Sequence, residues 1–294
     1  MRTLLRYDPV DYLVIGHITQ DVVPNGFAAS AAGTSYSVGG TASYSALTAK
    51  AAGLRVGIVT SCDPNLALPE LDGISIAVHP SEHSTTFENI QTPNGRVQVL
   101  HQQAQPLTLS DVPDAWRDAP IVHLGPVARE VDPKLVRAFS NSFIGLTPQG
   151  WLREWDPAGH VHMGEWPEHA YVLEQASAAV ISIEDVQRME DRIDEMAASL
   201  RILVVTEGAA GARLYWNGDL RYFKPPKEEE VDPTGAGDIF ATAFFIRLQQ
   251  TRDPWEAARF ATQLAAISVT RRGLSGTPTP DEVQSAMYEI IPDC

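Results

Sequence analysis

The stretch Val231-Asp-Pro-Thr-Gly-Ala-Gly-Asp238 runs directly into the apolar segment Ile239-Phe-Ala-Thr-Ala-Phe-Phe-Ile246. Gly235 and Gly237 allow the backbone to turn tightly and to approach a ligand closely. The first N–H groups of a helix have no partner inside it and lie at the positive end of its dipole, so this turn is suited to bind an anion. Asp238 adds a carboxylate that can accept the proton of a substrate hydroxyl. The stretch therefore predicts phosphoryl transfer, which depends on such positioning and charge stabilisation.

A structural interpretation of the same stretch is also open. Thr234 or Asp232 would then cap the helix, and Asp238 would only interact favourably with the helix dipole. A Gly-rich turn alone does not decide between the two interpretations, so the rest of the chain has to be considered.

Composition limits the class of protein. The chain has 294 residues, and its 22 Lys and Arg against 37 Asp and Glu give a formal net charge of −15. An acidic surface disfavours general binding to nucleic acid or to anionic lipid. Cys62 and Cys294 lie far apart and predict neither a zinc site nor a disulfide framework. Residues 1–10 do not resemble a signal peptide, and no apolar run has the length of a membrane helix, so we expect a soluble, cytoplasmic protein.

Strand-like and helix-like segments alternate along most of the chain. Short apolar runs predict buried strands, and longer segments with helical patterns lie between them. This alternation predicts an α/β fold of three layers, with a mainly parallel central sheet between two layers of helices. The predicted strands are 11–16, 56–60, 74–78, 121–124, 143–146, 179–183 and 202–206, and the predicted helices are 41–52, 133–140, 184–199, 236–250, 254–270 and 280–290.

Two segments lie outside this alternation and predict a small β lid. Asn94-Gly95 between two β-prone arms is a strong hairpin signal, and the arms carry polar residues. We therefore expect lid segments near 21–38 and 85–103, inserted into a single domain that spans 1–294. The lid is also the surface through which we expect a homodimer, if one forms. A second hairpin is predicted around Asn217-Gly218.

Four motifs in order resemble those of the ribokinase/PfkB-like carbohydrate kinases. The Gly-rich stretch resembles the signature Asp-Thr-x-Gly-Ala-Gly-Asp, with Pro233 at the Thr position. Gly39-Gly-Thr-Ala-Ser-Tyr-Ser-Ala46 resembles the Gly-Gly substrate loop, and Thr206-Glu-Gly-Ala-Ala-Gly211 matches the nucleotide loop Thr-x-Gly-x-x-Gly. Asp21 follows the first strand, where the family has a substrate-binding Asp. The resemblance spans nearly the whole chain and implies a ribokinase-like fold.

The resemblance implies a role for each matching residue. Asp238 would be the catalytic base, and the turn before it would bind the transferring phosphoryl group. The expected cofactors are ATP and Mg²⁺, and the expected partner is a small polyhydroxylated substrate. The implied site residues are Gly235, Ala236 and Gly237 for the anion, Thr206, Gly208, Gly211, Thr234 and Thr262 for the nucleotide, and Asp21, Gly39, Gly40 and Tyr44 for the substrate.

The chain departs from the family pattern at three further places. Tyr44 stands where the substrate loop usually carries Asn, and Thr262 stands where an Asn is common near the adenine pocket. The Asn-x-x-Glu motif that organises Mg²⁺ occurs only as Ser182-Ile-Glu-Asp185. Asp185 and Glu184 would then be the metal residues, or alternatively an N-terminal cap at a strand-to-helix junction.

Arg271 and Arg272 would complement a helix dipole or, alternatively, contact a nucleotide phosphate.

The substrate prediction is a small sugar or cyclitol. Gln149-x-x-x-Arg153 and the two glycine-rich motifs resemble plant-type myo-inositol kinases, which implies Gln149 and Arg153 as substrate residues. A nucleoside kinase of the adenosine type is the alternative among enzymes, since the same scaffold serves ribosides. A non-catalytic sugar-binding regulatory protein is the alternative of another class, although such a protein has no need of a base beside the anion site.

Overall fold

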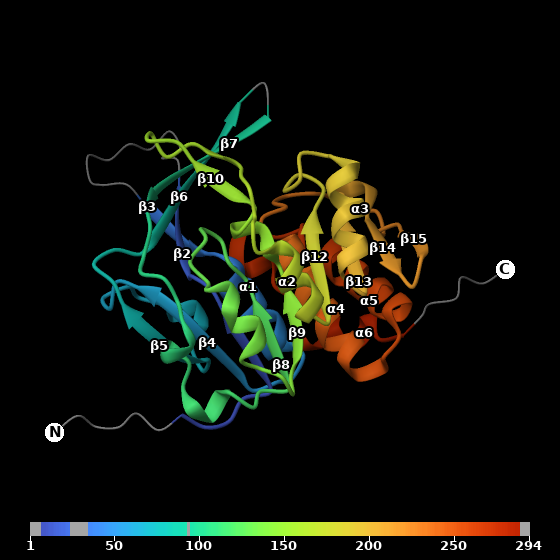
Figure 1. The fold of residues 1–294 in the computed structure, drawn as a ribbon, viewed down its shortest axis with the longest axis horizontal. Helices are drawn as coiled ribbons and strands as arrows, with labels where there is room; N and C mark the ends of the chain where they lie inside the picture. The colour runs from blue at the N-terminus through green and yellow to red at the C-terminus, as the bar shows by residue number, and fades with distance from the viewer. Residues whose placement is uncertain (1–6, 24–34, 93–94, 289–294) are drawn as a thin grey trace.

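The computed structural model describes residues 7–23, 35–92 and 95–288, and in them a nine-stranded sheet runs through the centre of the molecule (Figure 1). The strand order is β15-β14-β13-β12-β9-β8-β1-β4-β5. In this order, each strand from β13 to β5 is parallel to the next, whereas β14 pairs antiparallel with β13 and forms an antiparallel hairpin with β15 at one edge. The strands are β1 (Tyr12–Ile15), β4 (Val56–Cys62), β5 (Ser75–Pro80), β8 (Ile121–Leu124), β9 (Phe143–Leu146), β12 (Ala178–Ser182), β13 (Ile202–Thr206), β14 (Ala212–Trp216) and β15 (Asp219–Phe223).

Helices cover both faces of this sheet, because successive residues of a strand point to opposite faces and here both sets are apolar. In β1, Tyr12 and Val14 pack into the core shared with α1, α4, α5 and α6, while Leu13 and Ile15 pack into the core on the other face, which α2 and α3 cover. The predicted three-layer α/β fold is therefore confirmed. The helices are α1 (Thr41–Ala51), α2 (His169–Gln175), α3 (Glu190–Ser199), α4 (Ala236–Thr251), α5 (Pro254–Ser268) and α6 (Pro280–Ala286).

A smaller sheet of order β3-β2-β6-β7 extends beyond the main sheet, at the upper left of Figure 1. Its strands are β2 (Thr19–Val23), β3 (Ser35–Gly39), β6 (Thr85–Thr92) and β7 (Gly95–Gln102). They lie in the two segments expected to form a lid, although 24–34 and the turn residues 93–94 are outside the described part of the chain. A short hairpin of β10 (Arg153–Trp155) and β11 (Val161–Met163) meets this sheet, where Leu100 N–H donates to the carbonyl of Gly159 at 2.8 Å.

Several predicted helices differ from the observed ones. No α-helix begins at 184, because Gln187 and Arg188 have φ of 49° and 59°, and α3 starts only at Glu190. Segment 133–140 forms a short 3₁₀ helix, Pro133–Arg137, whose N-cap Asp132 accepts a hydrogen bond from the N–H of Lys134. Helix α5 ends at Ser268 and not at 270, and α6 ends at Ala286, before the undescribed residues 289–294. Helix α2 was not predicted.

None of the helices in the described ranges combines the length and the apolar character that a membrane crossing requires.

Candidate active site

A large cavity of about 1030 Å³ opens at the carboxyl ends of the parallel strands, below the small sheet. Ligands of open α/β sheets bind at this edge, near the strand where the order of the sheet reverses. Here that strand is β1, because the chain continues from it to β4 on one side, and β8 and β9 follow on the other. The residues predicted for the site that line the cavity are Asp21, Gly40, Tyr44, Gln149, Arg153, Glu184, Asp185, Thr206, Gly208, Gly211, Thr234, Gly235, Ala236, Gly237, Asp238 and Thr262.

Gly39 is the one predicted site residue that does not line the cavity. A Cβ atom at this position would lie 2.4 Å from Oδ2 of Asp21, on the neighbouring strand of the small sheet. Gly39 therefore lets the carboxylate of Asp21 lie close against the backbone. Direct binding of a substrate by Gly39 stays a prediction.

The Gly-rich turn has the conformation that an anion site requires. Helix α4 begins at Ala236, and its N-cap Gly235 has a left-handed φ of 80° without any side-chain capping bond. Capping of α4 by Thr234 or Asp232 is therefore wrong. Asp232 instead fixes the preceding loop, since its carboxylate accepts hydrogen bonds from the N–H groups of Thr234 (3.0 Å) and Gly273 (2.9 Å).

The two glycines of this turn have different roles. A Cβ atom on Gly235 would lie 2.2 Å from the ring of Tyr44, so Gly235 is needed for close packing as well as for its positive φ. A Cβ atom on Gly237 would meet nothing within 4 Å, and Gly237 therefore faces open space in the cavity. The N–H of Ala236 already donates to the carbonyl of Pro233 at 3.2 Å. The following amides, of Gly237 and Asp238, are therefore the best placed to bind an anion.

Asp238 lies where the N-termini of α1 and α4 meet. The hydroxyl of Thr41, the first residue of α1, donates to Oδ1 of Asp238 at 2.7 Å. Enclosure of the carboxylate by the protein raises the pKa of Asp238 to about 6; the nearby Asp185 also raises it, while the Thr41 hydrogen bond and Arg153 lower it. A base with a pKa near neutrality is suited to accept a proton from a hydroxyl.

The raised pKa predicts a stability cost at neutral pH. A folded-state pKa of about 6, against 3.8 for an ordinary Asp, means that the folded protein binds this proton more tightly than the unfolded chain. The free energy of unfolding therefore falls as the pH rises from about 4 to 6, and the full cost is present above 6. We expect Asp238→Asn to stabilise the protein at pH 7 by about 1–3 kcal/mol. Urea unfolding at pH 7 and pH 4 measures this, and a gain of equal size at both values would contradict it.

One end of the cavity has a polar entrance and an apolar wall. Thr206 ends β13, and Gly208, with a φ of 58°, follows it with no atom within 4 Å of a Cβ position. Gly211 has a packing role as well, since a Cβ there would lie 1.9 Å from the carbonyl oxygen of Phe223. The hydroxyl of Thr262 donates within α5 to the carbonyl of Ala258. The wall beyond these residues consists of Pro225, Pro226, Phe240, Ala265, Ala266 and Val269.

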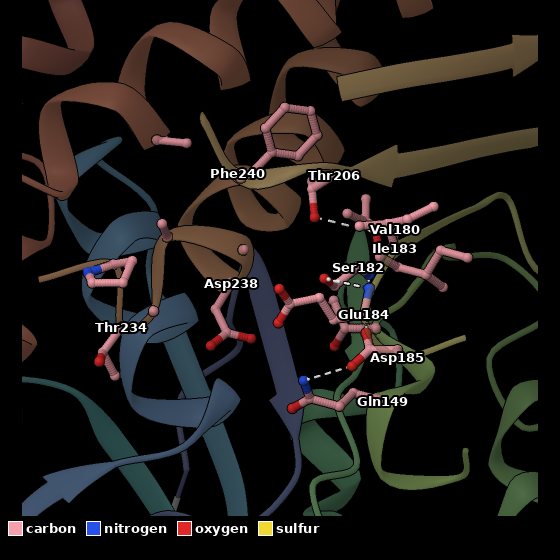
Figure 2. Close-up of a pocket in the computed structure, with 18 of the residues that line it drawn as sticks. Gln149, Val180, Ser182, Ile183, Glu184, Asp185, Thr206, Thr234, Asp238 and Phe240 are labelled. Atoms are coloured by element: carbon pink, nitrogen blue, oxygen red, sulfur yellow. Dashed lines mark hydrogen bonds between the residues drawn. The ribbon is translucent and has the colours of Figure 1, made fainter. Parts of the chain in front are cut away.

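The other end of the cavity is polar and lies between the main sheet and the small sheet. Gln149 Nε2 donates to Oδ1 of Asp185 at 2.9 Å, a bond visible in Figure 2. Arg153, on β10, donates to the carbonyl of Val127 at 3.0 Å and lies over the ring of Phe87, with 5.7 Å between the guanidinium carbon and the ring centroid. This end therefore offers amide and charged groups to a ligand with several hydroxyls.

Polar lining residues that the sequence analysis did not assign to the site include Thr41, Asn89, Gln98 and His162. Asn89 and Gln98 face each other on β6 and β7, and Gln98 Nε2 donates to Oδ1 of Asn89 at 3.0 Å. The polar content of the lid hairpin was the available signal for this pair. No pattern in the sequence indicated Thr41 or His162.

The donor set allows a partial magnesium site. Within the described residues, no three His, Cys, Asp or Glu side chains come together to hold a metal ion. Magnesium is commonly held by one or two carboxylates together with phosphate oxygens and waters. Asp185 fits this mode, because a carboxylate has lone pairs beyond the two that accept from Gln149 and from the Ser182 N–H (2.9 Å). Figure 2 shows Glu184 and Asp238 beside it.

The structure distinguishes between the alternative roles considered for Glu184 and Asp185 and for Arg271. Asp185 and Glu184 do not cap a helix, because the N-cap of α3 is Met189. Arg271 is held by both oxygens of Glu282 on α6, each at 3.0 Å, and is absent from the cavity lining. Contact between Arg271 and a nucleotide phosphate is therefore not supported by this arrangement.

Known proteins resemble the chain in sequence. Residues 172–282 match the family model described as pfkB family carbohydrate kinase. The chain is 28% identical to a probable fructokinase-4 of Arabidopsis thaliana (59% of this chain, 60% of the relative) and 28% identical to an inositol 3-kinase of Zea mays (72% and 55%). It is 25% identical to a cytidine kinase of Thermococcus kodakarensis, over 87% of this chain and 95% of the relative. The first two alignments thus span less than two thirds of the relatives' length.

Known structures resemble the fold over nearly the whole chain. A pyrophosphate-dependent kinase of the ribokinase family, complexed with a pyrophosphate analog and myo-inositol, aligns with a TM-score of 0.77 at 19% identity (93% of this chain, 99% of the other). The ribokinase of Arabidopsis thaliana complexed with ribose and ATP aligns with a TM-score of 0.73 at 17% identity (96% and 100%). Residues 172–282 thus resemble the pfkB family carbohydrate kinases in sequence, and the chain as a whole has the fold of ribokinase-family kinases.

Proposed function

We propose that the protein transfers the γ-phosphoryl group of ATP to a hydroxyl of a small sugar or cyclitol, with myo-inositol as a candidate. The observation that carries this proposal is the position of Asp238, whose carboxylate lies at the start of α4 between a polar end and an apolar-walled end of one cavity. An acceptor hydroxyl at the polar end and a phosphate at the turn would both meet at this carboxylate.

The transfer uses few groups of the chain. Asp238 accepts the hydroxyl proton as the acceptor oxygen bonds to phosphorus, and the electrons of the broken P–O bond leave with ADP. The amides of the Gly-rich turn stabilise the charge on the transferring group. Mg²⁺, when bound with the phosphates, neutralises their charge and orients them. Protonated Asp238 then returns its proton to water.

The acceptor end favours a polyol over a nucleoside. Its lining includes Asp21, Asn89, Gln98, Gln149 and Arg153, which can each exchange hydrogen bonds with hydroxyls. One aromatic surface at this end is Phe87, and the guanidinium of Arg153 lies over that ring. A nucleoside base would have to displace Arg153 to stack there. Similarity to an inositol 3-kinase supports the polyol, whereas similarity to a cytidine kinase keeps the nucleoside as the alternative acceptor.

The donor end favours ATP over pyrophosphate. Phe240, Ala265 and Val269 belong to an apolar wall that suits an adenine ring, which pyrophosphate lacks. Pyrophosphate also requires dense positive charge, and the Lys and Arg residues of the cavity lining are Arg153, Arg188 and Lys227. Arg188 lies 4.0 Å from Glu184, which offsets its charge.

Turnover of a donor-by-acceptor panel tests the proposal. ATP and pyrophosphate are each combined with pentoses, hexoses, myo-inositol and nucleosides, and the phosphorylated product is identified by mass and NMR. We expect turnover with ATP and at least one sugar or cyclitol. Turnover only with pyrophosphate would contradict the donor, and turnover only with nucleosides would contradict the acceptor. Calorimetric binding of a sugar without any phosphorylated product would favour the non-catalytic binding protein.

A further inference from the structure

Thr41 and Asp238 are 197 residues apart in sequence and meet through one hydrogen bond inside the cavity. Thr41 is the first residue of α1, is 2% exposed, and donates from Oγ1 to Oδ1 of Asp238 at 2.7 Å. A hydrogen bond from a hydroxyl to an ionised carboxylate is among the stronger ones in proteins. The contact therefore fixes one oxygen of the carboxylate and leaves Oδ2 to face other groups.

The Thr41 side chain is held in one orientation by packing. A Cβ atom added to Gly125, just after β8, would lie 2.5 Å from Cγ2 of Thr41, so the methyl group lies directly against this glycine. Thr is stiff about χ1, and in a helix its hydroxyl commonly turns toward the carbonyl of the preceding turn. At the first position of α1 no such carbonyl precedes it. The Thr41 hydroxyl is therefore left to bond to Asp238.

We propose that Thr41 is a positioning residue for the base, holding Oδ1 of Asp238 so that Oδ2 faces the acceptor hydroxyl. This inference rests on the proposed function, in which Asp238 accepts the proton of that hydroxyl. Thr41, which follows Gly39 and Gly40, would then assist proton transfer as well as begin α1.

Several charged or titratable groups surround the same carboxylate. Asp185, after β12, raises its pKa, and Arg153 on β10 lowers it. Burial raises the pKa of the phenols of Tyr44 on α1 and Tyr12 on β1, and the charge of Asp238 raises both further; Asp21 and Asp232 also raise the pKa of Tyr44. Enclosure by the protein and the charge of Asp185 favour the protonated form of Asp238, whereas the Thr41 hydrogen bond favours the ionised form. Its loss should therefore raise the pKa of Asp238 above about 6.

Two variants separate the hydroxyl from the shape of the side chain. Thr41→Val keeps a branched side chain against Gly125 and removes the donor, whereas Thr41→Ser keeps the donor and removes the methyl group. We expect the acid limb of the kcat/KM–pH profile to move up by about one pH unit in Thr41→Val. At pH values below the limb, kcat/KM should be roughly tenfold lower than in the unsubstituted protein, and this difference should become smaller at high pH. In Thr41→Ser the limb should stay where it is in the unsubstituted protein.

A second readout does not depend on turnover. The pH dependence of urea unfolding, measured for Thr41→Val with and without Asp238→Asn, reports the pKa of Asp238 in the folded state. We expect Thr41→Val to extend the pH range over which stability falls, and Asp238→Asn to abolish this effect. If Asp238→Asn kept full activity, the proposed function would fail, while the unfolding data would still report whether Thr41 acts on this carboxylate.

Three outcomes would overturn the inference. The acid limb could stay unshifted in Thr41→Val, with kcat/KM lowered equally at every pH, or it could move as far in Thr41→Ser as in Thr41→Val. The third outcome is a pH profile of unfolding in Thr41→Val that is identical to that of the unsubstituted protein. Each would reduce Thr41 to a packing residue. If Thr41→Val does not fold, Thr41→Ala is measured in the same two ways, and the same outcomes apply.

Discussion

We expect Asp238→Asn to lower kcat by about 10²- to 10⁴-fold, with little change in the affinity for ATP, because a positioned general base typically contributes a factor of this size. The amide side chain keeps the shape of the carboxylate and can still accept the hydrogen bond from Thr41. It cannot take up the proton of the acceptor hydroxyl. Steady-state kinetics and calorimetric titration with ATP measure the two quantities separately.

The matched control for this variant is Asp219→Asn. Asp219 is exposed on β15, at the edge of the main sheet, and does not line the cavity. The control makes the same change from carboxylate to amide, and its kcat should equal that of the unsubstituted protein. A kcat of Asp238→Asn within about threefold of the control would remove Asp238 from the chemistry, since it falls far short of a base's usual contribution.

Gly237→Val should lower turnover by about 10²-fold or more, because its side chain would hold the phosphate away from the N–H groups of the turn, and the loss of one such contact to a developing charge typically costs this much. The protein should still fold, because a Cβ at Gly237 meets nothing within 4 Å. The added side chain would instead occupy the space where the transferring phosphate approaches the start of α4. Circular dichroism and thermal unfolding check the fold, and kinetics with ATP checks the loss.

Gly235→Val provides the contrast for that variant. At Gly235 the backbone has a φ of 80° and a Cβ would lie 2.2 Å from the Tyr44 ring, so this substitution should destabilise the protein itself. Full turnover in a folded Gly237→Val protein would place the phosphate away from α4. An equal loss of thermal stability in both variants would show that Gly237 has a packing role and does not simply face the ligand.

The alternation of apolar strands and helices predicted the layers of the fold well, because a parallel sheet buried on both faces requires continuous apolar strands such as 12–15 and 202–206. Short elements with mixed polarity were harder. Helix α2 has seven residues, of which only Val172 and Leu173 are buried, so its sequence carries little helical pattern. The β10–β11 hairpin has three residues in each strand and was not distinguishable from a loop.

Site residues that lie close together in the sequence could be predicted, whereas contacts between residues far apart in the sequence could not. The Gly-rich turn is local, and its residues could be singled out from their own spacing. The contact of Asp238 with Thr41 and the pairing of Asn89 with Gln98 depend on how the chain folds back on itself, and a single sequence does not contain that information. Gln149 and Arg153 were found only through the family resemblance, which carries the outcome of folding in other chains.

The packing of Tyr44 against Gly235 has a consequence for how such an enzyme can change over evolutionary time. Tyr44 is 3% exposed; it lines the cavity from α1, and its ring forms the surface on which the Gly-rich turn rests. A substitution at Tyr44 that admits a new acceptor also alters the support of the turn that, in the proposed function, receives the phosphate. Because Tyr44 and the turn are in contact, substitutions at Tyr44 change acceptor preference and the rate of transfer together. An evolving protein that changes its acceptor would then need further substitutions to restore the rate.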